Sequence, residues 1–383
     1  MIKRIAFLSG LALFFLAGIT IQSCEDEVDL LAPYKATPVI FGVLDYTADT
    51  QFVRINKTYL GAGDANIYAQ VKDSVEYDQS EVDVWLIKKE LENVQFGIFE
   101  VLDSIQLQYI ELPSRDPGLF YNENVGFYYT TEDLFTAGEL SAITSPTSGN
   151  NNLFYEIRAS IRGKVYRGQT DFPTIALNDI SRPLPIGTPG VSRQDYYSGG
   201  NYRQLDFRYT NRERSERYQS THRIVYDYNT IDGDLVTDQI SDFRLGVRSS
   251  GSNGESSEVT FNAQSVYEFF GNQIKSNPEI AKVRIKKFEF RLTAASQTLD
   301  TYIEVANPIS DFTPVLRSYT NLDNGAIGIF GARATVAREF YINEPSLQHL
   351  NESPETTDGN AQPCYCVEGW IGTNYLCTTS PNC

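Results

Sequence analysis

The chain has 383 residues, a length that suggests about two domains. Hydrophobic residues make up 41% of it, enough for a sizeable core in each. Its formal net charge of −17 excludes the basic footprint that a nucleic-acid-binding protein needs. Aromatic residues reach 13%, with 24 tyrosines and 22 phenylalanines, and this composition favours pleated β-structure over helical bundles.

The first 23 residues have the pattern of a signal peptide. Lys3 and Arg4 precede an apolar run over 5–21, and the small residue Ser23 stands directly before Cys24. This order is typical of a secretory signal. The segment resembles the lipobox of bacterial lipoproteins, in which the cysteine, here Cys24, is acylated and becomes the new N-terminus. Ordinary cleavage and an uncleaved membrane helix are the alternatives.

Acidic residues follow Cys24 directly, and we predict a solvated tether over 24–34. An anionic membrane surface would repel these carboxylates. They also resemble the surface-export signal of Bacteroidota lipoproteins, which implies display on the cell surface. The alternative is an anchor in the inward-facing leaflet. The residues of this candidate export signal are Glu25, Asp26, Glu27 and Asp29.

Short alternating runs separated by Gly, Pro and Asp predict an immunoglobulin-like β-sandwich over 35–175. Arg162-Gly163 predicts the turn of a hairpin, and residues 89–93 are expected to form another turn. The strands are expected at 39–44, 52–57, 82–87, 94–99, 153–159 and 164–170. The stretches 57–77 and 110–152 are interpreted as long insertions, where a partner surface is expected.

Prolines and glycines crowd the segment 176–201, which predicts a linker to a second β-rich domain over 202–350. A slip in the alternation at Lys286-Lys287 predicts a β-bulge. Apolar residues at helical spacing predict two short helices that pack into the core, and Asn262 is the expected N-cap of the first. Strands are expected at 205–209 and 218–228 around a solvated tip at 211–216, and the helices at 262–275 and 293–306.

Several of these features together resemble one family. They are the leader with Cys24, the strand exit at 164–173, the segment from Asn307-Pro308 to 324–331, and the Cys-x-Cys of the tail. They resemble a family of uncharacterised Bacteroidota outer-membrane lipoproteins. The resemblance implies two β domains, a C-terminal Cys-rich tail, and a gene that accompanies a TonB-dependent outer-membrane receptor. It implies no catalytic residues.

Four cysteines lie in the C-terminal tail, 351–383, and predict two disulfides, because an even set in an exported protein favours oxidised pairs. Cys364 and Cys366 are poorly placed to bond to each other along an extended chain. Each is therefore expected to pair with Cys377 or Cys383, in either connectivity. A zinc site of four thiolates and free or intermolecular thiols are the alternatives.

Little in the sequence points to catalysis, and we predict neither a metal nor a cofactor. His222 and His349 stand outside the known metal-ligand and nucleophile spacings. The acidic segment 232–242 fits a turn better than a calcium loop. Ser74 and Ser104 lie in three-residue matches, Asp-Ser-Val and Asp-Ser-Ile, that resemble the O-glycosylation signal of exported Bacteroidota proteins, although such short matches also arise by chance.

These observations favour a non-enzymatic, surface-exposed outer-membrane lipoprotein. We expect it to be an accessory or binding subunit of an outer-membrane complex, with a β-barrel such as a TonB-dependent transporter as its partner. A free-standing glycan- or peptide-binding module is the second hypothesis, because tyrosine and phenylalanine rings can form binding platforms. A hydrolase is the third.

Overall fold

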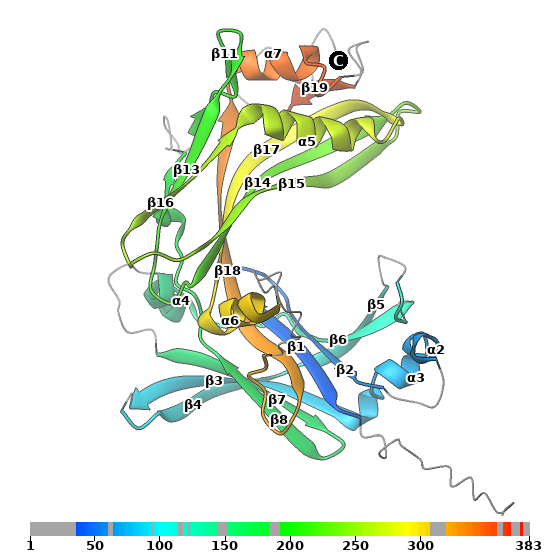
Figure 1. The fold of residues 1–383 in the computed structure, drawn as a ribbon, viewed down its shortest axis with the longest axis vertical. Coiled ribbons are helices and arrows are strands. Elements are labelled where there is room, and N and C mark those ends of the chain that lie inside the picture. Colours follow the sequence, from blue (N-terminus) through cyan, green and yellow to red (C-terminus); the bar gives the residue numbers. More distant parts are fainter. Residues whose placement is uncertain are drawn as a thin grey trace, which may run out of the picture.

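The computed structural model describes residues 36–59, 64–93, 95–113, 118–121, 123–144, 152–183, 192–306, 319–357, 363–368 and 376–377. In this part the protein is mainly β, as predicted (Figure 1). The strands are β1 (Pro38–Asp45), β2 (Gln51–Lys57), β3 (Val82–Asn93), β4 (Ile98–Gln106), β5 (Gln108–Pro113), β6 (Asn124–Thr130), β7 (Leu153–Ile161), β8 (Lys164–Thr170), β9 (Ile180–Arg182), β10 (Ser192–Gln194), β11 (Tyr197–Ser198), β12 (Asn201–Tyr202), β13 (Gln204–Thr210), β14 (Arg217–Thr230), β15 (Leu235–Ser249), β16 (Ser256–Asn262), β17 (Ile280–Ala295), β18 (Ile327–Ile342) and β19 (Cys364–Val367). The helices are α2 (Ala65–Ala69), α3 (Lys72–Val75), α4 (Ala137–Thr144), α5 (Ala263–Lys275), α6 (Gln297–Ala306) and α7 (Glu344–Glu352), with 3-10 turns η1 (Gln79–Glu81) and η2 (Leu177–Asp179).

One large sheet connects the two halves of the described molecule. Its strand order is β15-β14-β17-β18-β1-β2-β6-β5, with β10 beside β18 and β19 beside β17. The first part of β18 pairs in parallel with β1, and its second part pairs in antiparallel with β17. This long strand therefore runs from the lower half to the upper half in Figure 1.

The lower half is a β-sandwich, as predicted. A second sheet, ordered β4-β3-β7-β8, faces the strands β1, β2 and β6. Alternating side chains from both sheets meet in one core, to which β1 contributes Ile40, β3 contributes Leu86 and β7 contributes Ile157. The period of two along each strand explains why one face of each sheet is buried.

The upper half has its own core against the same large sheet. Helix α5, helix α7 and a small sheet ordered β16-β13-β9 supply the opposing side chains. Asn262 caps α5 by accepting a hydrogen bond from the backbone N–H of Gln264, as predicted. Both cores lie on one face of β18, because Phe330 enters the lower core and Phe340 the upper one. We call this the inner face of the large sheet and the opposite side its outer face.

Two segments predicted as irregular carry strands instead. The stretch 110–152, interpreted as a long insertion, contains most of β5 together with β6 and α4, and both strands belong to the large sheet. In the stretch 176–201, predicted as a linker, the described residues form η2, β9, β10 and β11, and Tyr196 is fully buried. The residues 89–93, predicted as a turn, continue β3.

The predicted solvated tip at 211–216 is also wrong. Asn211 and Ser215 are both buried, and Arg212 forms an ion pair with the buried carboxylate of Asp179. The flanking strands do not pair with each other, because β13 lies between β16 and β9 while β14 lies between β15 and β17. The charged segment 211–216 is thus held against the protein by the Asp179 carboxylate, which lies about 30 residues earlier in the chain.

Helix α6 begins four residues later than predicted and packs differently. Residues 293–295 remain in β17, because they pair with both β14 and β18. The side chains of α6 are at most half-buried, so the predicted core position of its apolar stripe is wrong. The helix lies instead on the outer face of the large sheet, where Leu299 covers Gly331.

The cysteine tail is part of the fold. Strand β19 pairs in parallel with β17, and Tyr365 and Val367 enter the upper core. A disulfide joins Cys366 to Cys377, with their Cα atoms 4.9 Å apart, which is one of the pairings left open by the sequence. Cys364 is disulfide-bonded as well.

Candidate functional site

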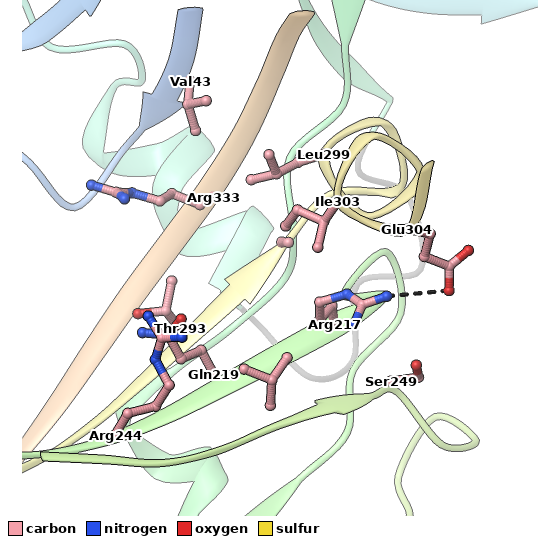
Figure 2. A pocket seen from close by; sticks show the side chains of 12 residues that line it. Val43, Arg217, Gln219, Arg244, Ser249, Thr293, Leu299, Ile303, Glu304 and Arg333 are labelled. Carbon is pink, nitrogen blue, oxygen red and sulfur yellow. Dashed lines mark hydrogen bonds and ion pairs between the residues drawn. The ribbon is translucent and has the colours of Figure 1, made fainter. Parts of the chain in front are cut away.

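One functional candidate is a pocket on the outer face, at the junction of the two halves (Figure 2). Its volume is about 880 Å³. Strands β14, β15, β17 and β18 form its floor, and α6 forms one wall. The lining residues are Val43, Arg217, Gln219, Arg244, Val247, Ser249, Thr293, Ala295, Leu299, Ile303, Glu304 and Arg333. This size and this mixture of apolar and polar groups are those of small-molecule sites in proteins.

The position of α6 creates the pocket. A side chain at Gly331 would bring its Cβ to 3.2 Å from the Cβ of Leu299, so the glycine allows the helix to approach β18 closely. The Ser296 side chain, just before the helix, accepts a hydrogen bond from the backbone N–H of Ala332. Leu299 and Ile303 are separated by four residues, so they project from one side of α6 and face the pocket.

Three arginines from three different strands reach the pocket. Arg217 forms ion pairs with Asp300 and with Glu304 of α6, the latter at 3.1 Å. Figure 2 shows the Arg217–Glu304 pair at the mouth of the pocket.

The other two arginines differ in their charge compensation. Arg333 lies 3.0 Å from the carboxylate of Asp45. Within the described residues Arg244 forms no ion pair and no side-chain hydrogen bond. Arg244 is therefore the cation of this pocket whose charge is left without a counterion.

Beyond the pocket, towards the upper half, the outer face is covered by compensated charges. Arg223 donates two hydrogen bonds of 2.6 Å to the carboxylate of Asp242. Burial raises the pKa of Glu289, but hydrogen bonds from Lys287 and Arg291 outweigh burial and leave the pKa below its usual value. The cations of these pairs are partly exposed, whereas the Glu289 carboxylate is buried.

Towards the lower half, the outer face carries aromatic rings in place of charges. Phe41 on β1 is 40% exposed and Phe52 on β2 is 42% exposed. Phe52 contacts Phe127 and Tyr129 of β6, with ring centroids 6.0 and 6.2 Å apart, and Phe41 contacts Tyr302 of α6 at 6.1 Å. We call these five residues the aromatic face.

A smaller, shallower site lies in the upper half, at the β11–β12 hairpin. His349 of α7 stacks on Tyr197 with ring centroids 3.6 Å apart, and Tyr202 meets both rings edge-on. Burial lowers the pKa of His349, and its Nε2 atom is buried without a hydrogen-bond partner. The pocket has a volume of about 410 Å³ and is also lined by Gly200, Asn201, Asn262, Gln264, Pro354 and Glu355.

The two serines predicted as glycosylation sites lie on different elements of the described structure. Ser104 is exposed on β4, an edge strand of the sandwich, whereas Ser74 is half-buried in α3. Cys24 and the acidic residues after it lie outside the described residues, as does Cys383. His222 is fully buried.

Nothing in the described ranges resembles a metal centre, since no group of three His, Cys, Asp or Glu side chains is arranged to hold an ion there. In the same part of the chain, no helix has both the length and the apolar character needed to span a bilayer.

Sequence reasoning missed both the pocket and the aromatic face. Phe41 and Phe52 were assigned to strands, but which face of a strand is solvent-exposed depends on its neighbours. The signal that could have pointed to the face is a large aromatic residue in the polar phase of an alternating strand, as at Phe52 before Val53. The chain matches no protein-family model and no curated protein.

Proposed function

We propose that this chain is a non-enzymatic, lipid-anchored outer-membrane protein, displayed on the cell surface, that acts as a binding subunit of an outer-membrane complex. Its partner is an integral β-barrel of the TonB-dependent transporter type. The single observation that carries the proposal is the aromatic face. Four of its five rings occupy the solvent side of neighbouring sheet strands, where antiparallel sheets normally carry polar residues.

The chemistry of the aromatic face suits a protein partner. Exposed apolar patches on soluble domains mark interaction sites, and aromatic residues are enriched where binding energy is concentrated. Phe41 and Phe52 are each more than a third exposed, so a partner can bury them further. Arg54 lies 5.9 Å from the centre of the Phe127 ring and adds a cation that can pair with an acidic group of that partner.

The predicted anchor favours a membrane-embedded partner over a soluble one. Eleven residues lie between Cys24 and Ala36, where the described chain begins. Even fully extended, such a segment spans at most about 40 Å. If Cys24 carries the lipid, the sandwich and its aromatic face stay close to the bilayer, within reach of a barrel.

The test is capture of the protein from native outer membrane after extraction in mild detergent, followed by mass spectrometry of what copurifies. We expect one β-barrel protein in stoichiometric amount. The double variant Phe41→Ser/Phe52→Ser should reduce recovery of the barrel at least about tenfold. Truncating central aromatic residues of an interface weakens binding by about 2 kcal/mol or more.

The matched control is Phe96→Ser. Phe96 is 71% exposed but lies in the β3–β4 turn of the other sheet. It should leave recovery unchanged. Recovery of the wild-type protein alone, or equal losses for both variants, would contradict the proposal, and thermal unfolding of each variant checks that it is folded.

A second candidate function is glycan binding at the β11–β12 hairpin. The observation that favours it is the combination of Tyr197 and Tyr202 rings with the amides of Asn201 and Gln264 and the carboxylate of Glu355. Rings stack on sugar faces, and amides and carboxylates bond hydroxyl groups.

A glycan array probes this second function. We expect a defined set of glycans to bind the wild-type protein, and Tyr197→Ala to abolish their binding. Tyr129→Ala, which alters a ring of the aromatic face, should not affect it. An array without hits removes the glycan hypothesis and leaves the partner-binding proposal untouched.

A further inference from the structure

We propose that the pocket beside α6 binds a carboxylate-bearing amphiphile, whose head group is held by Arg244 and whose apolar chain lies against Leu299, Ile303 and Val247. This ligand site is separate from the aromatic face proposed above for a protein partner. It would give the protein a small-molecule ligand of its own.

The head-group site follows from the charges around the pocket. The chain carries 49 acidic residues against 32 basic ones, so most cations can find a carboxylate nearby. Arg217 and Arg333 do so, but Arg244 pairs with no carboxylate among the described residues. A guanidinium forms a planar fork of donors that matches a carboxylate, and such a pair is about twice as strong as a neutral hydrogen bond.

Neutral polar groups next to Arg244 complete the head-group site. Val247, on the same strand, pairs with Gln219 of β14, which in turn pairs with Thr293 of β17. Figure 2 shows the Arg244 side chain extending along the floor of the pocket towards Thr293. The Gln219 amide and the Thr293 hydroxyl can donate to an anion without adding a competing negative charge.

The apolar part of the ligand is inferred from the apolar side chains on the α6 wall of the pocket. Leu299 and Ile303 face the pocket from α6, and Val43 and Ala295 line it from the sheet. Val247 is 43% exposed, although it is a large apolar side chain in a strand. Covering this surface removes it from water, so an alkyl chain contributes to binding in addition to the carboxylate.

The charges at the mouth discriminate against a cationic ligand. Glu304 is the exposed carboxylate of the pocket, and it already pairs with Arg217. A cation would therefore have to compete with Arg217 for Glu304 and approach the uncompensated Arg244. The positive charges of the ligand and of Arg244 would repel each other, and this repulsion opposes binding. The same geometry leaves a neutral alkyl ligand without any gain from Arg244.

The experiment is isothermal titration calorimetry with decanoate below its micellar concentration. The mature chain carries Cys24→Ser, which removes the predicted lipid attachment point and allows work without detergent. Decanol and decyltrimethylammonium serve as neutral and cationic probes of equal chain length. We expect decanoate to bind at least about tenfold more tightly than decanol, as one charge-assisted pair implies, and the cationic probe to bind weakest.

Variants locate the site. Arg244→Gln should abolish the preference for decanoate over decanol, and Ile303→Ser should weaken both ligands. Arg248→Gln is the matched control, because this exposed arginine lies on the same strand but does not line the pocket. It should leave both affinities unchanged.

Three results would overturn the inference: absence of decanoate binding, equal affinity for decanoate and decanol, or an Arg244→Gln protein that keeps the preference. If Arg244→Gln fails to fold, the comparison of the three probes on the wild-type protein still decides. Loss of this site would not affect copurification of a barrel partner, so the two proposals fail independently.

Discussion

His222 should make the stability of the protein depend on pH. Burial lowers the pKa of His222 to about 3, against 6.5 for a free histidine. Rings of Phe207, Phe288 and Phe340 surround the imidazole, and among the described side chains only the hydroxyl of Tyr196 hydrogen-bonds to it, at Nε2. The folded protein therefore keeps this side chain neutral under mildly acidic conditions.

The direction of the effect follows from proton binding. Between pH 6.5 and about 3 the unfolded chain binds a proton at His222 that the folded chain excludes. The free energy of unfolding must then fall as the pH falls through this window. Each pH unit is equivalent to about 1.4 kcal/mol, so His222 alone should remove roughly 2 to 3 kcal/mol between pH 7 and pH 4.5.

The assay compares two variants that differ at one ring. Tyr196→Phe keeps the histidine, and Tyr196→Phe/His222→Phe replaces it without leaving the tyrosine hydroxyl unpaired. Urea unfolding is measured for both at pH 7 and at pH 4.5. Carboxylates contribute equally to both proteins, so the difference in their pH dependence isolates His222.

We expect the Tyr196→Phe variant to lose roughly 2 to 3 kcal/mol more than the double variant over this pH range. A constant offset between them at both pH values would reflect only a change in packing. Equal losses for the two variants would refute the reasoning, because they would mean that the imidazole becomes charged inside the core.

Two further predictions concern the strands that hold the large sheet together. Gly328→Ala should destabilise the protein by at least about 3 kcal/mol in urea unfolding, because its φ of +115° is unfavourable for alanine and its Cβ would lie 2.0 Å from the carbonyl oxygen of Ile40. Gly246→Ala, which meets no atom within 4 Å, should change stability by less than about 1 kcal/mol, and similar losses for both would contradict this account. The double variant Cys366→Ser/Cys377→Ser removes a disulfide that joins residues 11 positions apart. It should lower the free energy of unfolding by about 3 kcal/mol and make amide exchange in β19 faster. Unchanged stability would show that the disulfide does not constrain the unfolded chain.

The features that the sequence predicts well depend on neighbouring residues. Asn262 caps α5 because its side chain and the N–H it bonds are two residues apart. Arg162 and Gly163 both adopt positive φ, as the hairpin turn between β7 and β8 requires. The bulge at Lys286 follows from a slip in local alternation, and the pairing of β14 with β17 shifts there.

The features that were missed depend on distant partners. The tip at 211–216 is buried because Arg212 meets Asp179, and no local pattern indicates that contact. The parallel pairing of β1 with β18 joins residues almost 290 positions apart, and it determines which face of β1 meets solvent. Arg217, Arg244 and Arg333 converge only because β14, β15 and β18 belong to one sheet. Composition alone could not predict that convergence.

The outer face of the large sheet changes chemistry at α6, and this change favours two different ligands on one protein. The helix covers Gly331 of β18 where the two halves meet. On one side of it, Phe41 and Phe52 are exposed, and Arg54 is the charged residue beside them. This surface suits a large apolar partner. On the other side, Arg217, Arg223, Arg291 and Arg333 each pair with a carboxylate, whereas Arg244 pairs with none in the described part of the chain, which suits a small anion. A single protein partner that covered both sides would bury Arg244 uncompensated, at a cost that grows as water is removed. The arrangement is therefore best explained by a protein partner on the aromatic face and a separate anionic ligand in the pocket.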